Sequence, residues 1–225
     1  MPVLITHTST ISNPSLVLCI YGVGGVGKST LASTAPAPIF LDAERGTKGF
    51  GVRGIDVPMI DVRSWLDVQE AWTLIKGDET YKTVVIDPVG SFLDLLLDHV
   101  RAGGDMNLKK WGDAKDRMRK FIIAAKDSGK HIVFVAHEKE DKDDDQILRR
   151  PLLQVNLWNE LVNICDVVGH LRIDGKGERS LRVQPEPKYY AKERYDVFGQ
   201  NIPNPNISEM VKVLHDKCLA KSKKA

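Results

Sequence analysis

The feature that most constrains the fold of this chain is the sequence Gly22-Val23-Gly24-Gly25-Val26-Gly27-Lys28-Ser29-Thr30. It fits G-x-x-x-x-G-K-[ST], the pattern of a phosphate-binding P-loop. The apolar residues 16–21 precede it and predict a buried strand, and the residues after Lys28 can begin a helix. Because a P-loop requires this strand–loop–helix order, we expect these residues to bind the phosphates of ATP.

The residue types explain the chemistry that we expect. Glycines allow backbone conformations in which successive N–H groups point toward phosphate oxygens. The helix that follows adds the partial positive charge of its first turn. Lys28 would reach the β- and γ-phosphates, and the Ser29 hydroxyl would ligate Mg²⁺.

A second metal ligand is predicted at the end of another strand. Residues 81–87 form an apolar run that ends in Asp87, the pattern of a Walker B aspartate that holds the Mg²⁺ shell. The next residue is Pro88 rather than glutamate. A general base, if the chain has one, must therefore come from elsewhere.

Two further strands are predicted to end in polar residues near the nucleotide. Residues 38–42 lead into Asp42 and Glu44, and residues 131–137 end in His137. Ligands of open α/β sheets lie beyond the carboxyl ends of the strands. We therefore expect Glu44 to be the general base and His137 to contact the γ-phosphate. The same patterns would also arise if Glu44 were only a solvated acid in a turn and if His137 only ended its strand.

Composition is typical of one globular domain, with 225 residues, 42% of them hydrophobic and 28% charged. We expect a flexible lead-in over residues 1–14, an ATPase domain over 15–215 and a basic tail over 216–225. The three cysteines lack metal-ligand spacing and indicate reduced thiols in a cytoplasm. We find no signal peptide and no apolar run that could span a bilayer, so we expect no membrane association.

The net charge is only +2, so a nucleic-acid surface would have to be a local patch. Residues 101–120 carry seven Lys and Arg against three Asp and Glu, which predicts either a solvated helix face or a basic loop that meets phosphates. Residues 138–150 are so densely charged that we expect them to be mobile, and their acidic run limits DNA contact there to two arginines. The candidate DNA contacts are Arg101, Lys109, Lys110, Arg149 and Arg150.

The remaining patterns complete an α/β fold. Helices are predicted over residues 64–76, 90–100, 108–128 and 155–165. Residues 166–173 and 180–183 flank Asp174-Gly175-Lys176-Gly177, which predicts a β-hairpin. We expect a mainly parallel, twisted sheet with helices on both faces and an antiparallel edge.

These motifs together resemble the RecA-type recombinase ATPases, and most of all the core-only RecA-like proteins that bacteriophages encode. The resemblance covers about residues 15–200. Phe40-Leu41-Asp42-Ala43-Glu44 is similar to the RecA segment whose glutamate activates the attacking water, and Asp87 matches the Walker B aspartate. His137 lies where these proteins have a polar residue that links the γ-phosphate to a DNA-binding loop.

The resemblance also extends to Lys192-Glu193-Arg194, which is similar to the Lys-x-Arg pair that reaches the nucleotide of the neighbouring subunit. It implies a RecA-like P-loop core and a DNA-stimulated ATPase that binds single-stranded DNA as a homo-oligomer, either a ring or a filament. The implied function is annealing or strand exchange in recombination, with ATP and Mg²⁺ as cofactors. A single-stranded-DNA-binding protein is a further candidate partner, and the implied location is the cytoplasm of a bacterial host.

Two other functions fit parts of the sequence. Residues 24–30 also resemble the P-loop of ParA/MinD-type partition ATPases, which act as switches on a protein partner, but Val23 stands where those proteins have a signature lysine. A small-molecule phosphotransferase is the third alternative. It would need a lid with arginines over the phosphates, a role that Arg149 and Arg150 could fill.

Overall fold

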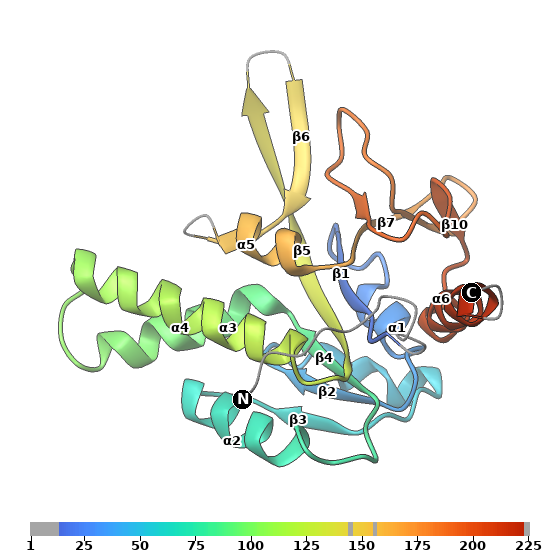
Figure 1. Ribbon diagram of the computed structural model, residues 1–225. Helices are drawn as coiled ribbons and strands as arrows, with labels where there is room; N and C mark the ends of the chain where they lie inside the picture. The colour runs from blue at the N-terminus through green and yellow to red at the C-terminus, as the bar shows by residue number, and fades with distance from the viewer. Residues whose placement is uncertain (1–13, 144–145, 155–156, 223–225) are drawn as a thin grey trace.

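A mostly parallel, twisted sheet runs through the middle of the structure (Figure 1). The computed structural model describes residues 14–143, 146–154 and 157–222. In these residues the strand order is β10-β8-β7-β1-β5-β4-β2-β3, with β6 paired to β5 and β9 paired to β7. The strands are β1 (Val17–Gly22), β2 (Pro38–Asp42), β3 (Met59–Asp61), β4 (Thr83–Asp87), β5 (His131–Asp143), β6 (Gln146–Pro151), β7 (Val167–Ile173), β8 (Arg179–Arg182), β9 (Lys192–Glu193) and β10 (Asn201–Pro203).

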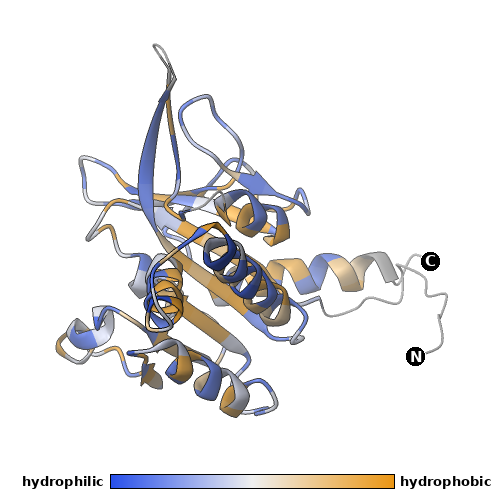
Figure 2. Ribbon diagram, turned by 90° about the vertical axis from the view of Figure 1, so that its left-hand side faces the viewer, coloured by the Kyte–Doolittle hydropathy of each residue, from blue (hydrophilic) through white to orange (hydrophobic). Residues whose placement is uncertain are grey.

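The central strands are buried on both faces, which is why they read as continuous apolar runs. Along β1, the alternate residues Val17, Cys19 and Tyr21 enter one hydrophobic core. Leu18 and Ile20 enter the other core, on the opposite face of the sheet. Figure 2, a view turned by 90° from that of Figure 1, shows the apolar strands between the helices.

Helices cover both faces, as the sequence predicted. One core contains residues of α2 (Trp65–Ile75), α3 (Val89–Arg101), α4 (Leu108–Lys126) and α5 (Leu157–Ile164). The other core contains residues of α1 (Lys28–Ala32) and α6 (Ile207–Ser222). Two short 3-10 helices, η2 (Gly46–Gly49) and η3 (Gly51–Arg53), follow β2. The structure thus confirms the α/β class with a mainly parallel sheet.

The predicted hairpin around Gly175 is confirmed. β7 and β8 pair antiparallel, with Ile173 opposite Arg179. β7 itself pairs parallel with β1, so the hairpin turns the parallel sheet into an antiparallel edge. This geometry brings β8 close to the P-loop that follows β1.

The expectation that residues 138–150 are mobile is not what the structure shows. β5 continues beyond His137 and pairs antiparallel with β6, with Glu140 opposite Arg149. The charges along this ribbon are complementary, because Arg149 pairs with Glu140 at 2.7 Å and Arg150 pairs with Asp141. Opposite charges on facing strands stabilise a pairing that a count of charges alone would not predict. Asp144 and Asp145, part of the expected acidic run, lie outside the described residues.

The root of this ribbon is fixed to the sheet by a buried polar cluster. Glu138 Oε2 lies 2.7 Å from His170 Nε2 on β7. The His170 ring stacks on Tyr189 with the ring centroids 4.4 Å apart, and Arg149 also pairs with Glu138. Leu152, just after β6, donates its N–H to the carbonyl oxygen of His137.

The two ends of the chain are described only in part. Residues 1–13 of the predicted lead-in and residues 223–225 of the predicted tail lie outside the described residues. α6 continues to Ser222, so helix replaces most of the expected tail. No helix within the described ranges is long and apolar enough to cross a membrane.

A pH test follows from His131, at the start of β5. Its Nδ1 accepts a hydrogen bond from the Leu16 N–H at 2.9 Å, and burial, with a smaller effect of His215, lowers the pKa of His131 from 6.5 to about 4. Between these values the unfolded chain binds a proton that the folded chain does not. The free energy of unfolding should therefore fall as the pH drops from about 6.5 to about 4.

The variant His131→Asn keeps an acceptor for the Leu16 N–H but has no group that titrates in this window. Urea unfolding at pH 7, 6, 5 and 4.5 should show a shallower loss of stability for this variant than for the parent protein. Equal slopes for the two proteins would contradict the lowered pKa of His131 in the folded chain.

Candidate active site

The P-loop runs from the end of β1 to the start of α1, and its backbone needs glycine at two places. A Cβ on Gly22 would lie 2.4 Å from the Leu171 carbonyl oxygen, and a Cβ on Gly27 would lie 2.8 Å from Arg179 Nε. Gly27 also has φ 103°, a conformation that other residues rarely adopt. The loop is therefore packed against β7 and β8, which fixes its shape.

Lys28 is the buried cation of this loop. It is 7% exposed, and its Nζ donates hydrogen bonds to the carbonyl oxygens of Gly22 and Val23, both at 2.9 Å. Burial lowers the pKa of Lys28, and the nearby carboxylates of Asp87, Glu138 and Glu44 act in the opposite direction. A buried ammonium whose hydrogen bonds, among the described residues, go to neutral carbonyl oxygens is well placed to bind an anion.

Asp87 ends β4 and is 6% exposed. Burial raises the pKa of Asp87 to about 6, and a hydrogen bond from Ser29 lowers it in part. Its Oδ2 is buried, and the described residues provide no hydrogen-bond partner for it. An orphaned carboxylate oxygen beside a hydroxyl fits the ligand set that Mg²⁺ takes together with nucleotide phosphates.

Glu44 lies in the loop after β2, and its carboxylate is held from two sides. Ser91, in the first turn of α3, donates its hydroxyl to Glu44 Oε1 at 2.6 Å. His137 Nε2, on β5, lies 3.4 Å from Glu44 Oε2. The side chains of Glu44 and His137 are both about half exposed, which leaves Glu44 open to water.

Asp42 has a structural role in placing Glu44. It is 1% exposed and accepts hydrogen bonds from the backbone N–H groups of Glu44, Gly46 and Thr47 and from the Thr47 hydroxyl. The carboxylate therefore shapes the loop from inside. Its contacts within the loop explain why the residues after β2 turn toward the P-loop.

The strand order brings the predicted groups together. β5 lies between β1 and β4, and His137 on β5 pairs with Gly22 at the start of the P-loop. Asp42 and Asp87 pair in the same way on β2 and β4. A cavity of about 260 Å³ is lined by predicted site residues that come from separate segments: Gly24, Gly25, Gly27, Lys28, Ser29, Thr30, Glu44, Asp87 and His137.

The structure places Lys192 and Arg194 elsewhere. β9 pairs with Val167 and Val168 at the start of β7, away from the end of β1 that carries the P-loop. Lys192 Nζ donates to the carbonyl oxygens of Val162 and Asn163 at the end of α5, and Arg194 pairs with Asp166 at 3.1 Å. Neither residue lines the cavity of its own chain, and their action on a neighbouring subunit stays a prediction.

The candidate DNA contacts are dispersed. Arg101 pairs with Asp98, and Lys110 donates to the carbonyl oxygens of Gly103 and Gly104, whereas Lys109 is exposed. Arg149 pairs with acids of the β5–β6 ribbon.

Arg150 is only 7% exposed, and its guanidinium lies 4.4 Å from the centre of the Trp158 ring. That burial argues against the expected contact of Arg150 with DNA. It also argues against the lid role that the phosphotransferase alternative would give it.

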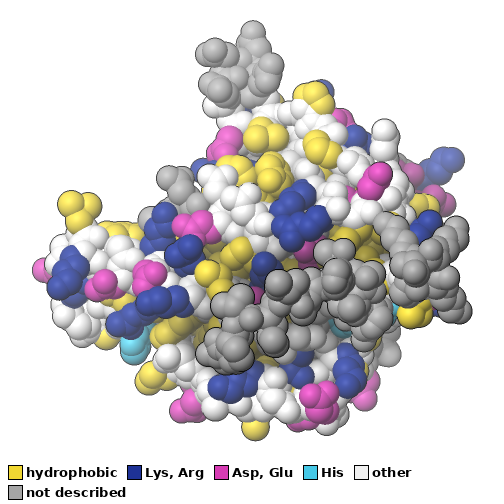
Figure 3. All heavy atoms as spheres, in the orientation of Figure 1, with side chains coloured by type: hydrophobic (Ala, Val, Ile, Leu, Met, Phe, Trp, Pro, Cys, Tyr) yellow, Lys and Arg dark blue, Asp and Glu magenta, His cyan; other side chains and the backbone are white. Residues whose placement is uncertain are grey.

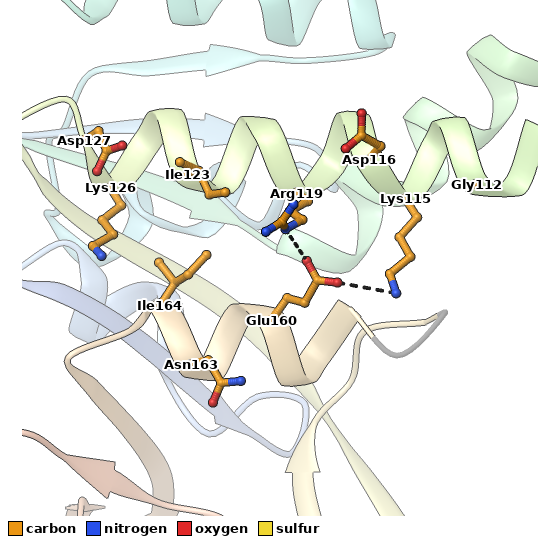
Figure 4. Close-up of a pocket in the computed structure, with 10 residues that line it drawn as sticks. All are labelled: Gly112, Lys115, Asp116, Arg119, Ile123, Lys126, Asp127, Glu160, Asn163 and Ile164. Carbon is orange, nitrogen blue, oxygen red and sulfur yellow. Dashed lines mark ion pairs between the residues drawn. The ribbon is translucent and has the colours of Figure 1, made fainter.

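Another cavity lies away from these residues. Its volume is about 770 Å³, and it lies between α4 and α5 (Figure 4). Glu160 bridges Lys115 and Arg119 there, at 3.4 and 3.1 Å. None of the predicted site residues lines this cavity.

Sequence reasoning missed three residues at the candidate site: Ser91, Arg53 and Arg179. Arg53 Nη1 donates to the Thr30 hydroxyl at 2.8 Å, and Arg179 Nε donates to the Val26 carbonyl oxygen at 2.8 Å. Ser91 could have been found, because it is a polar residue in the first turn of the helix after Asp87. The two arginines stand in segments without a recognisable motif, and only the fold brings them to the P-loop.

A prediction follows from the buried carboxylate of Asp42. Asp42→Ala removes the acceptor of four hydrogen bonds and leaves buried N–H groups unpaired, so the free energy of unfolding should fall by about 3 kcal/mol. Glu44→Gln is the matched control. The Glu44 side chain is half exposed, so removing its charge should leave the free energy of unfolding nearly unchanged. Urea unfolding of both variants measures the difference, and equal stabilities would contradict the structural role of Asp42.

Comparison with known proteins adds two findings. A family model described as "AAA domain" matches residues 15–195. The chain is also 21% identical, over 217 residues, to a protein named SPbeta prophage-derived uncharacterized protein YorG of Bacillus subtilis (strain 168). That alignment covers 88% of this chain and 65% of the relative. The chain therefore spans about two thirds of the length of the curated relative that it matches.

Proposed function

The chain belongs to the AAA domain family of P-loop ATPases, and from that premise we propose that it hydrolyses ATP with Mg²⁺, using Glu44 as general base. The observation that carries the proposal is the cavity beside the P-loop. It holds a buried lysine, an orphaned carboxylate oxygen and a solvent-accessible carboxylate together. These are the groups that phosphoryl transfer to water requires.

Ser29 and Asp87 would hold the Mg²⁺ ion together with oxygens of the nucleotide. Bound there, the ion would neutralise charge on the phosphates. Such a site needs no cluster of three protein ligands, and none of the described residues form one. Lys28 would leave the carbonyl oxygens of Gly22 and Val23 and bind phosphate oxygens instead.

Glu44 would accept a proton from the water that attacks the γ-phosphate. Its carboxylate already has a fixed direction, because Ser91 holds one oxygen and His137 lies beside the other. The half-exposed position keeps the carboxylate accessible to water. His137, on the strand next to the P-loop, would contact the γ-phosphate. Because it also lies beside Glu44, it would hold the phosphate and the base in a fixed relative position.

Two substitutions separate nucleotide binding from turnover. Glu44→Gln keeps the size of the side chain but removes the base, so ATP binding should stay within about twofold while kcat falls by about 10²–10⁴. Lys28→Ala should abolish binding itself. Calorimetric titration and steady-state phosphate release measure the two quantities, with Glu79→Gln as an exposed control that should change neither. Normal turnover by Glu44→Gln would mean that another group is the base.

We also propose that the partner is single-stranded DNA and that the protein acts as a homo-oligomer in recombination, as its resemblance to phage RecA-like proteins implies. Two observations support this. The relative named above is described as prophage-derived, which favours a phage origin and a bacterial cytoplasm for this chain as well. In addition, α3 and α4 run side by side and project from the sheet (Figure 1), and Lys and Arg side chains are frequent on that projection (Figure 3).

Arg101 and Lys109 lie near the outer end of the projection, where α3 ends and α4 begins. There they could meet phosphates without blocking the nucleotide cavity. Lys192 and Arg194 lie away from the cavity of their own chain, so a role for them in hydrolysis requires a second subunit.

Single-stranded DNA should increase the rate of ATP hydrolysis, and this stimulation should fall steeply between 50 and 200 mM salt, because phosphate contacts release counterions. The double variant Arg101→Gln/Lys109→Gln should lose most of the stimulation but keep the basal rate. Lys212→Gln/Lys217→Gln, with the same charge removed from α6, is the matched control. If DNA has no effect at low salt while ATP still binds, the partner is a protein and the switch function replaces this proposal.

A further inference from the structure

A pocket of about 590 Å³ lies at the edge of the sheet opposite to the nucleotide cavity. Lys82 precedes β4 and Lys130 precedes β5, and both residues line the pocket. Asp87 and His137, farther along the same two strands, line the nucleotide cavity. Because a strand rises about 3.3 Å per residue, the part of β5 from His131 to His137 spans about 20 Å. The two sites can therefore be occupied at the same time.

The charge around this pocket is mainly positive. Among the described residues, its lining includes three lysines, Lys76, Lys82 and Lys130, and one carboxylate, that of Glu79. Glu79 lies 3.4 Å from Lys82, but the two side chains are 91% and 58% exposed, so water weakens the pair. A cleft lined by charges of one sign concentrates ligands of the opposite sign.

Lys130 repeats a feature of Lys28 in the P-loop. It is 8% exposed, and its Nζ donates hydrogen bonds to the carbonyl oxygens of Asp78 and Tyr81 at 2.7 and 2.8 Å. An ammonium group has three donors, so these two bonds do not use all of them. Both acceptors are neutral, so they leave the buried charge unbalanced. An anion in the pocket would stabilise it.

Two histidines form another wall of the pocket. His131 Nδ1 accepts the Leu16 N–H, so the neutral ring carries its proton on Nε2, which is a donor. His215, on α6, has its ring centre 5.9 Å from that of His131, and its Nε2 donates to the Pro14 carbonyl oxygen at 3.2 Å. A ligand with acceptor oxygens would therefore find an imidazole donor as well as the lysines.

The occupant that fits these groups carries negative charge and several acceptor oxygens. Phosphate oxygens meet both needs, and the volume is within the range of small-molecule sites, about 300–1,000 Å³. Residues 1–13, which precede Pro14 beside the pocket, contain no aspartate or glutamate, so they supply no such charge. Ligands of open α/β sheets usually lie at the carboxyl edge, so the charge of this pocket, and not its place in the fold, indicates a site.

We propose that this pocket is a second anion site, which binds a phosphate-bearing ligand through Lys76, Lys82 and Lys130. Lys130 would fix one phosphate from inside the pocket, and the two exposed lysines would close around it. His131 Nε2 would donate to a further oxygen. The phosphate belongs either to a small phosphorylated molecule or to the backbone of a nucleic acid, because the lysines would bind both in the same way.

The test follows the resonances of His131 and His215 by NMR, with pyrophosphate as the probe. It uses the full chain with Lys28→Ala, because the P-loop of that variant should no longer bind phosphates. Pyrophosphate should shift both resonances in a saturable manner. The resonance of His137, in the nucleotide cavity, should stay in place and so report that the P-loop is empty.

The double substitution Lys76→Gln/Lys82→Gln, added to the same variant, should weaken pyrophosphate binding about tenfold, because two charged donors are lost. Both side chains are exposed, so the fold should be retained. Lys120→Gln/Lys176→Gln is the matched control. It removes the same charge from exposed positions that do not line the pocket, and the affinity should not change.

Two results would overturn the inference. The first is that pyrophosphate leaves His131 and His215 unshifted. The second is equal affinity with and without Lys76→Gln/Lys82→Gln, which would attribute the shifts to ionic strength. If the inference holds, a short oligothymidylate that produces the same shifts identifies a nucleic acid as the ligand, and a response to pyrophosphate alone identifies a small molecule. Since every sample carries Lys28→Ala, none of these results depends on the proposed ATPase function.

Discussion

The burial of the central strands on both faces is the constraint on which the rest of the structure depends. In the centre of the sheet β1, β5, β4 and β2 run parallel between two layers of helices, so their carboxyl ends meet at one edge. In this chain that edge carries Gly22, Asp42, Asp87 and His137, paired across neighbouring strands. Glu44 and His137, which are 93 positions apart in the sequence, come within 3.4 Å of each other beside this edge.

The electrostatics of the site follow from the same burial. Lys28 and Asp87 are both nearly excluded from water, so burial disfavours the charged form of each. Within the described part of the chain no ion pair joins Lys28 to Asp87, and a bound magnesium nucleotide would supply each of them with a group of opposite charge. The site therefore holds opposite charges at a cost in stability, as expected of groups arranged for a ligand. Asp42 differs, because its own loop satisfies it with four hydrogen bonds.

The sequence predicted the parts of the site that depend on local patterns. The P-loop, the strand that ends in Asp87 and the hairpin around Gly175 each occupy one short segment with its own signal. The β5–β6 ribbon was missed because a high density of charge predicts a mobile segment. Pairs such as Glu140 with Arg149 stabilise the ribbon, and a count of charges does not show which residues pair. Arg53 and Arg179 were missed because their contacts join distant segments, and nothing in their immediate neighbours indicates a partner.

β5 is shared by two parts of the molecule. His137 faces the nucleotide cavity, and the next residue, Glu138, joins the polar cluster at the root of the ribbon. Leu152, where the ribbon returns, is bonded to the His137 carbonyl oxygen. The ribbon and the nucleotide cavity therefore share one continuous strand, and the backbone of His137, the residue beside Glu44, is hydrogen-bonded to the end of the ribbon's second strand.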